Sequence, residues 1–447
     1  MLTATQADGS KTTSTAFCLR QDGIVATTWS NIANASSATI RTIYDKEIRV
    51  AGVLAKDTEH NLVILKVDDG GLSEVQLGQS TYTKANELVF IIGDSLPSVN
   101  RMVLGLISPE YKKAREVEEY QPVIPVIGPF TARDNGAPIL SGSGGRAIGV
   151  ALATDPGPGQ DKARHTAVVV PIEELRMVMK NMKSVPEPLT PHGDYATSNE
   201  GHYWAGRLDE VNGDLLDALK HYQIVLTSDS KNISASFQYA YVSELQGNHD
   251  IAAQGYARTL GINPREEKSL FNLGLIQFAQ GKLADAEKNF SAAGAAGVKF
   301  VKAFDRLGMT QEQLHQPDKA LAAYAKAREA KETDTYSSLR IAHILFDQQK
   351  WGAAATAAKK AREAGVDSTE IYLIEADSYC HTHSYLQAWD LAHRGTERNS
   401  KVSRLWAIMV ESSQKLKNDD RAKQELAILQ TLDPEAAKLL MNNPAAK

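Results

Sequence analysis

The first 180 residues alternate short apolar runs with turn-forming residues, a pattern typical of β-strands. The runs are rich in Val, Ile and Thr and are separated by Gly, Asp, Asn or Pro at intervals of about ten residues. Clear examples are Gly23–Thr28, Ala38–Tyr44, Asn61–Val67, Glu87–Gly93 and Arg146–Leu152. Short strands at regular spacing, with turn signals between them, predict a sandwich or barrel over residues 1–180.

A proline-rich stretch ends this region. Between Val185 and Pro191 the chain carries Pro186, Pro188 and Pro191. Proline has no backbone N–H and opposes both helix interiors and strand pairing. Residues 181–198 are therefore predicted to form a linker between two domains.

From residue 199 to residue 447 the apolar positions follow helical spacing, and one residue type recurs. Alanine stands at every thirty-fourth position, seven times in register: Ala218, Ala252, Ala286, Ala320, Ala354, Ala388 and Ala422. A small residue lies twelve positions before six of the seven, and an aromatic ring lies four positions after the first four. The small residue and the alanine would let two helix backbones approach closely, with the ring filling space beside the next repeat.

This period resembles the tetratricopeptide (TPR) repeat, in which each repeat is a pair of helices. The resemblance implies an all-α superhelix of about seven repeats. Together the two patterns predict a multidomain chain: an N-terminal all-β domain over 1–180, the linker over 181–198 and the TPR array over 199–447.

Length and charge agree with two soluble domains. The chain has 447 residues, more than one core usually supports, and a net charge of −5. It has no basic stripe, so nucleic acid is not an expected partner. The two cysteines, Cys18 and Cys380, fall in different predicted domains and have no metal-ligand spacing, so neither a disulfide nor a metal site is expected. No cofactor is predicted.

Targeting signals are also missing from the pattern. The start, from Met1 to Gly9, has no apolar core of the kind that signal peptides carry, and no apolar run is long enough to span a bilayer. The chain is expected to be soluble, with its compartment unassigned. A signal removed from a longer precursor would be compatible with an extracytoplasmic location.

Four ordered segments of the β half resemble HtrA-type trypsin-like serine proteases. They are Phe17–Ile32, Asp57–Val67, the pair Leu77–Ser80 and Val89–Asp94, and Arg133–Leu140 followed by Ala147–Ala151. The resemblance implies a trypsin-like double β-barrel.

The same alignment implies that the catalytic triad is degenerate. The general-base histidine falls at Ser30, the orienting aspartate at Asn61 and the nucleophilic serine at Asn135. A serine protease needs a hydroxyl activated by an imidazole that a carboxylate orients. An amide cannot serve as the nucleophile, and neither serine nor asparagine replaces the base or the charge. We expect a pseudoprotease and not an enzyme.

The oxyanion hole is also expected to be disrupted. Arg133 replaces a glycine two residues before Asn135, and Asp134 would bring an acid next to groups that should donate to an oxyanion.

An alternative is a serine hydrolase or peptidase with a relocated site. Gly142–Gly145 carries Ser143 in a sequence similar to a nucleophile motif, and His60 or His165 would have to supply the base. The Pro-Ile-Leu strand precedes this motif instead of following it, so a glycine-rich hairpin turn is the favoured interpretation.

The repeats are predicted to bind protein or peptide ligands through a concave face, and the protease-like cleft is a second potential peptide site. Within the TPR pattern, aromatic and apolar residues of the first three repeats fall at positions that line this face. The predicted peptide-binding residues are Tyr203, Phe237, Tyr241, Phe271, Leu275 and Phe278. The favoured hypothesis is a non-catalytic protein-interaction scaffold.

Overall fold

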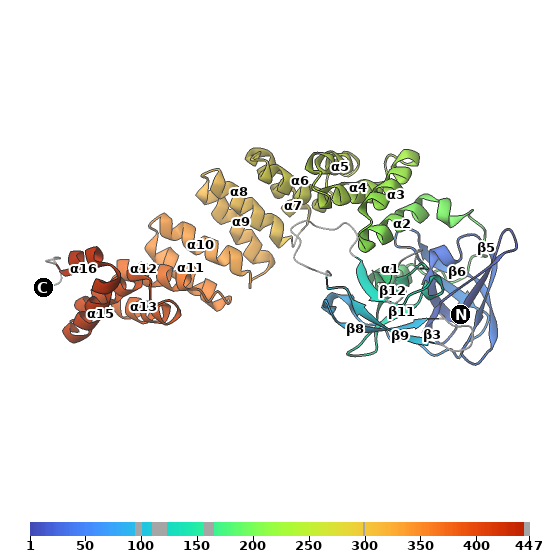
Figure 1. Cartoon of the computed structure of the whole chain (residues 1–447), viewed down its shortest axis with the longest axis horizontal. Helices are drawn as coiled ribbons and strands as arrows, with labels where there is room; N and C mark the ends of the chain where they lie inside the picture. Colours follow the sequence, from blue (N-terminus) through green and yellow to red (C-terminus); the bar gives the residue numbers. More distant parts are fainter. Residues whose placement is uncertain (94–100, 110–122, 156–164, 298–299, 442–447) are drawn as a thin grey trace. The chain divides into compact units, whose positions relative to one another are not determined.

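The computed structural model describes residues 1–93, 101–109, 123–155, 165–297 and 300–441. The chain divides into two compact units, Met1–Pro264 and Arg265–Lys447. Among the described residues, the first unit holds the strands, helix α1 and the first two helix pairs, and the second unit holds the later helix pairs and α16 (Figure 1).

The first seven strands form one antiparallel sheet in the order β2-β1-β5-β6-β7-β4-β3. Their inward side chains form a core around Leu2, Val25 and Leu65. The strands are β1 (Leu2–Gln6), β2 (Lys11–Ser14), β3 (Phe17–Arg20), β4 (Ile24–Thr28), β5 (Ala35–Arg41), β6 (Glu47–Asp57) and β7 (Leu62–Val67). Strands β2 and β3, at the two ends of this order, follow each other in the chain.

The next six strands close into a barrel in the order β10-β13-β12-β11-β8-β9. They are β8 (Leu88–Gly93), β9 (Arg101–Ile107), β10 (Ile124–Gly128), β11 (Pro138–Ser141), β12 (Ala147–Leu152) and β13 (His165–Pro171). Alternate residues point inward, so Val89, Ile91 and Val103 are buried in the barrel core. Helix α1 (Ile172–Lys180) follows β13.

All five apolar runs singled out in the sequence contain strands, and the trypsin-like all-β class is confirmed. The run predicted at 38–44 is shifted toward the N-terminus, because the chain turns at Thr42: the Thr42 N–H donates to the Lys46 carbonyl (2.9 Å), and Asp45 adopts a positive φ of 62°. The first half is a seven-stranded sheet, whereas the second half is the closed barrel.

The proline-rich stretch forms one strand-like pairing that its composition did not predict. Glu187 and Val53 exchange two backbone hydrogen bonds of 2.8 Å. Glu187 keeps its N–H because the prolines stand on either side of it. A Cβ at Gly52 would lie 2.2 Å from the Glu187 carbonyl oxygen, so glycine is needed there for the approach.

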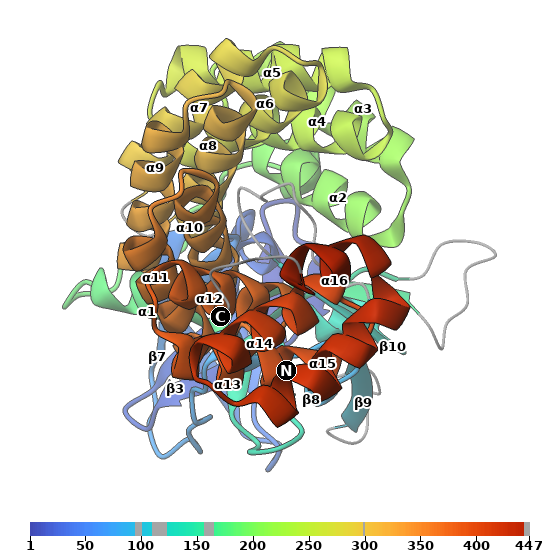
Figure 2. The same cartoon turned by 90° about the vertical axis from the view of Figure 1, so that its left-hand side faces the viewer.

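The helical part consists of consecutive pairs, as the 34-residue period predicts (Figures 1 and 2). Within the described residues the pairs are α2 (Asn199–Asn212) and α3 (Leu215–Ser228), α4 (Ile233–Leu245) and α5 (His249–Ile262), α6 (Glu267–Ala279) and α7 (Leu283–Ala296), α8 (Val301–Gln313) and α9 (Pro317–Ala330), α10 (Thr335–Asp347) and α11 (Trp351–Glu363), α12 (Thr369–His381) and α13 (Tyr385–Arg398), and α14 (Ser403–Lys415) and α15 (Asp419–Leu432), followed by α16 (Pro434–Met441).

The repeated alanines are buried, and the small residues allow close approach. A Cβ at Gly206 would lie 2.8 Å from the Tyr222 ring, and Gly274 stands in the same relation to Phe290. In these two repeats the ring four residues after the alanine therefore packs on the small residue of its own repeat. In the fourth repeat the Tyr324 ring also lies against the next repeat, 6.0 Å from the Tyr336 ring between centroids, as the sequence interpretation predicts.

The boundary between the compact units does not coincide with the predicted linker. Helix α2 contacts β13, and the Ser234 hydroxyl at the start of α4 donates to the Glu59 carboxylate (2.9 Å). The first two repeats therefore belong to the same compact unit as the β part. Within the described residues, no helix combines the length and apolar character needed to cross a membrane.

Candidate functional site

The three positions assigned to the triad meet in space. Ser30 lies on the 3₁₀ turn Trp29–Asn31. Asn61 lies just before β7, and Asn135 lies just before β11. The Ser30 N–H donates to Asn61 Oδ1 (2.7 Å). Asn61 Nδ2 and Asn135 Nδ2 approach Ser30 Oγ at 3.3 Å and 3.2 Å. The fold thus brings Asn61 and Asn135, which are 31 and 105 positions from Ser30 in the sequence, into contact with Ser30.

A fourth residue, Asn31, completes this cluster. Its side chain is buried and its Nδ2 donates to Thr27 Oγ1 (2.8 Å) and to the Asn135 carbonyl (3.1 Å). Asn135 Nδ2 donates in turn to Asn31 Oδ1 (2.9 Å). The sequence reasoning missed Asn31, although its position directly after Ser30 was a usable signal.

The cluster is chemically unlike a serine-protease triad. Its one hydroxyl, on Ser30, receives two amide N–H donors and lies 3.2 Å from Thr28 Oγ1. None of these partners is a base at neutral pH. Ser30, Asn31, Asn61 and Asn135 are thus linked by hydrogen bonds between neutral groups.

The backbone before Asn135 forms a turn whose hydrogen bond uses the Asn135 N–H. Residues Ala132–Asp134 form a 3₁₀ turn, so the Asn135 N–H donates to the Ala132 carbonyl (3.2 Å). In trypsin-like proteases the nucleophile's own N–H is a donor of the oxyanion hole. Here that donor already has an acceptor within the turn.

The Asp134 carboxylate is oriented by the 3₁₀ turn that precedes Asn135. It is buried and caps the 3₁₀ turn, accepting the Thr131 N–H (2.9 Å). The same Oδ2 lies 3.2 Å from Thr131 Oγ1, within a capping box at Thr131. The Arg133 carbonyl accepts the Thr15 hydroxyl (2.9 Å).

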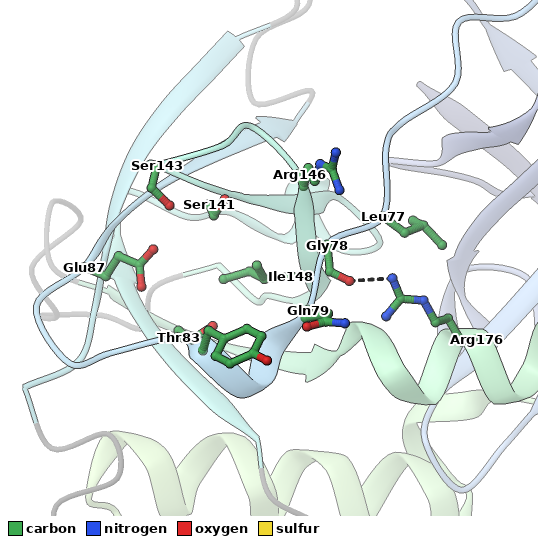
Figure 3. A pocket seen from close by; sticks show the side chains of 11 residues that line it. Leu77, Gly78, Gln79, Thr83, Glu87, Ser141, Ser143, Arg146, Ile148 and Arg176 are labelled. Carbon is green, nitrogen blue, oxygen red and sulfur yellow. Dashed lines mark hydrogen bonds between the residues drawn. The ribbon is translucent and has the colours of Figure 1, made fainter.

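Ser143 lies in the exposed turn between β11 and β12, as the hairpin interpretation predicts. The Ser141 N–H donates to the Arg146 carbonyl and the Gly145 N–H donates to the Ser141 carbonyl, each at 2.9 Å. A cleft of about 460 Å³ opens beside this turn (Figure 3). Neither His60 nor His165 is among the residues that line it.

Both histidines have other partners. His60 Nδ1 lies 2.7 Å from Asp57 Oδ2, and its Nε2 lies 3.5 Å from Glu174 Oε2. His165 is buried, with its Nε2 3.4 Å from Thr154 Oγ1, and burial lowers its pKa. Neither imidazole faces a serine in these contacts.

His60 should make the stability of the β part depend on pH. Burial lowers its pKa, but the hydrogen bond and charge of Asp57 outweigh that effect, so the pKa is raised above its ordinary value of 6.5. A raised folded pKa stabilises the fold below the unfolded value, and this contribution is lost as pH rises through the folded value.

We expect His60→Asn to lower the free energy of unfolding more at about pH 5.5 than at about pH 8.5. Equilibrium urea unfolding at the two pH values measures this difference. An equal loss at both would show that His60 is not held by these carboxylates.

The predicted aromatic groove is wrong. Tyr203, Phe237, Tyr241, Phe271 and Leu275 are all buried, and Phe278 is half-buried. Phe237 packs 5.4 Å from the Tyr256 ring and Phe271 packs 5.7 Å from the Phe290 ring, between ring centroids.

The physical reason lies in helix geometry. Phe237 precedes the small residue Ala240 by three positions, and Phe271 precedes Gly274 by three, so each shares a helix face with the small residue that meets the second helix. Two acidic residues on the same set of helices are also engaged within the repeats: Glu210 accepts the Tyr222 hydroxyl (3.1 Å) and Glu244 accepts the Tyr256 hydroxyl (2.8 Å).

The described ranges contain no group of three or more His, Cys, Asp or Glu side chains that could hold a metal ion. Both cysteines are free and buried.

Comparison with known proteins agrees with both halves of the fold. Residues 14–150 match the family described as a trypsin-like peptidase domain, and residues 246–297 match the tetratricopeptide repeat. The chain thus carries a trypsin-like peptidase domain followed by TPR repeats.

Curated relatives match different lengths of the chain. The putative serine protease HhoB of Synechocystis sp. is 26% identical over 173 residues, which are 38% of this chain and 40% of that protein. A probable periplasmic serine endoprotease, DegP-like, of Pseudomonas fluorescens is 22% identical over 273 residues, 57% of each chain. Photosystem I assembly protein Ycf3 of Synechococcus elongatus is 29% identical over 91 residues, 20% of this chain and 53% of that protein. The chain spans about half the length of these curated relatives.

Proposed function

We propose that this chain is a non-catalytic protein-interaction scaffold, in which an inactive trypsin-like domain is joined to TPR repeats that bind protein or peptide partners. One observation carries the proposal: Ser30, Asn61 and Asn135 occupy the triad positions of the alignment and hydrogen-bond to one another as neutral groups. The relatives HhoB and DegP-like are named as serine proteases, so the proposal is that this chain has lost their chemistry.

The closed 3₁₀ turn supports the same conclusion. Even a restored nucleophile at position 135 would begin with its N–H hydrogen-bonded to Ala132. Preorganised donors supply a large part of the rate enhancement in acyl transfer, and losing one costs about 10²–10³ in kcat. Residue chemistry and backbone geometry are thus both unfavourable to catalysis.

A binding role for the repeats follows from their class and from one relative's name. Ycf3 is named as a photosystem I assembly protein and is 29% identical to this chain over 91 residues. Since most of the aromatic positions are buried, we expect partners to contact mainly other surfaces of the repeats. Capture experiments should use the full chain, because the first two repeats share a compact unit with the β part.

A fluorophosphonate probe tests the loss of hydrolase chemistry, since it labels activated serines. We expect no labelling of the full-length chain, while active trypsin in a parallel sample is labelled. Ser143→Ala is the matched variant for the alternative hypothesis. Labelling of the wild type that this variant abolishes would establish the relocated site and overturn the proposal.

A further inference from the structure

A cleft lies at the other end of β11 from the degenerate triad. Asn135 precedes the first residue of β11, Pro138, whereas Ser141 is its last residue and lines the cleft. The four-residue strand separates the two sites by roughly 13 Å. The lining comprises Leu77, Gly78, Gln79, Tyr82, Thr83, Glu87, Ser141, Ser143, Arg146, Ile148 and Arg176 (Figure 3).

One wall of this cleft is held in place by helix α1. Glu173 accepts the Ser80 N–H (2.9 Å), and Arg176 donates to the Gly78 carbonyl (2.5 Å). The Gly78 N–H donates to the Ala147 carbonyl (2.7 Å), which ties the same segment to β12. The wall is therefore preformed, and a ligand would not have to order it.

The charges lining the cleft are separated. Figure 3 shows Glu87 and Ser143 on one side and Arg146 and Arg176 on the other. Arg176 is engaged with Gly78 and lies 3.9 Å from the Glu173 carboxylate. Arg146 is exposed, and among the described residues no acidic side chain forms an ion pair with it. The cleft thus offers one uncompensated guanidinium.

Neutral groups also line the cleft. The hydroxyls of Ser141 and Ser143 line the cleft, and Ile148 and Leu77 supply apolar surface. Tyr82, on the same lining, leaves 76% of its surface exposed. The volume of about 460 Å³ is within the range of ordinary ligand pockets.

We propose that this cleft binds the carboxylate of a short peptide segment, with Arg146 as the charged anchor. Guanidinium groups pair with carboxylates through two parallel N–H donors, and an aromatic ring beside the anchor can cover an adjoining apolar side chain. Glu87, across the cleft, would face the N–H donors of the same segment and so fix its direction.

This site adds to the proposed function and does not depend on the triad being inactive. Loss of peptide binding would leave the scaffold proposal standing, and serine labelling by a fluorophosphonate would leave the cleft proposal standing. The two can therefore fail separately.

The test measures fluorescence polarisation of a labelled hexapeptide, fluorescein-Gly-Ser-Ala-Ala-Val-Leu, with the full-length chain. Three forms distinguish the source of the carboxylate: the free C-terminal acid, the C-terminal amide, and an amide with glutamate in place of valine. We expect the acid form, the glutamate form or both to bind, and the plain amide to bind at least about tenfold more weakly.

Variants place the binding in the cleft. Arg146→Glu should weaken binding about tenfold or more, Arg146→Lys should retain part of it, and Arg49→Glu, an exposed charge reversal on β6, should change nothing. Equal binding of all three peptides, no binding up to millimolar concentration, or equal loss in the two charge reversals would overturn the proposal. Displacement by inorganic phosphate as readily as by the free acid would also overturn it, since the site would then recognise any anion.

Discussion

Phe237→Ala is expected to lower the free energy of unfolding by about 3–5 kcal/mol. The ring is fully buried, and it packs against Tyr256 of the same repeat at 5.4 Å. Removing it leaves a cavity between α4 and α5 that the two backbones cannot close. Equilibrium urea unfolding followed by far-ultraviolet circular dichroism measures the loss.

Leu216→Ala is the matched control in the same unit, because Leu216 lies on α3 with 69% of its surface exposed. It should change the free energy of unfolding by less than about 0.5 kcal/mol. If Phe237→Ala were equally mild and instead weakened partner capture, the ring would be a binding residue after all, and the buried position found here would be contradicted.

Asn135→Ser alone is expected to restore no peptidase activity. The new hydroxyl would lie beside Ser30 and Asn31, which cannot accept its proton as an imidazole does. Members of a catalytic triad act as a unit, so one restored member brings almost none of the rate. Casein hydrolysis by this variant should stay at the background level.

The triple variant Ser30→His, Asn61→Asp, Asn135→Ser is a sharper probe. If the 3₁₀ turn keeps the residue-135 N–H bonded to Ala132, its kcat should remain about 10²–10³ below that of an intact trypsin-like protease. Full activity in the triple variant would show that the turn opens easily and that the missing side chains are the sole defect.

The sequence was most informative where a local rule repeats. The alanine period fixed the helix pairs because small residues are required wherever two backbones meet, and this requirement does not depend on the rest of the fold. The meeting of Ser30, Asn61 and Asn135 was predictable from the alignment alone, since their partners in the family also come from distant segments.

The features that the sequence did not predict depend on the directions of side chains and on distant backbone pairing. Spacing along the chain does not determine either of these. Phe237 and Phe271 were assigned to a surface because the TPR pattern puts their positions near the concave face, but their i,i+3 relation to a small residue turns them into the helix pair. The direction of the Asp134 carboxylate depends on the 3₁₀ turn Ala132–Asp134, whose capping box at Thr131 orients it. The pairing of Glu187 with Val53 needs a partner strand 134 residues away.

The most direct test of the central claim is hydrolysis of fluorescein-labelled casein by the wild-type chain, with an active HtrA-type protease as the positive control. The account predicts no release of fluorescent peptides above a blank sample, even at micromolar protein over many hours. Sustained turnover that copurifies with the chain and disappears in Asn135→Ala or Ser143→Ala would contradict it, and the affected variant would identify the working site.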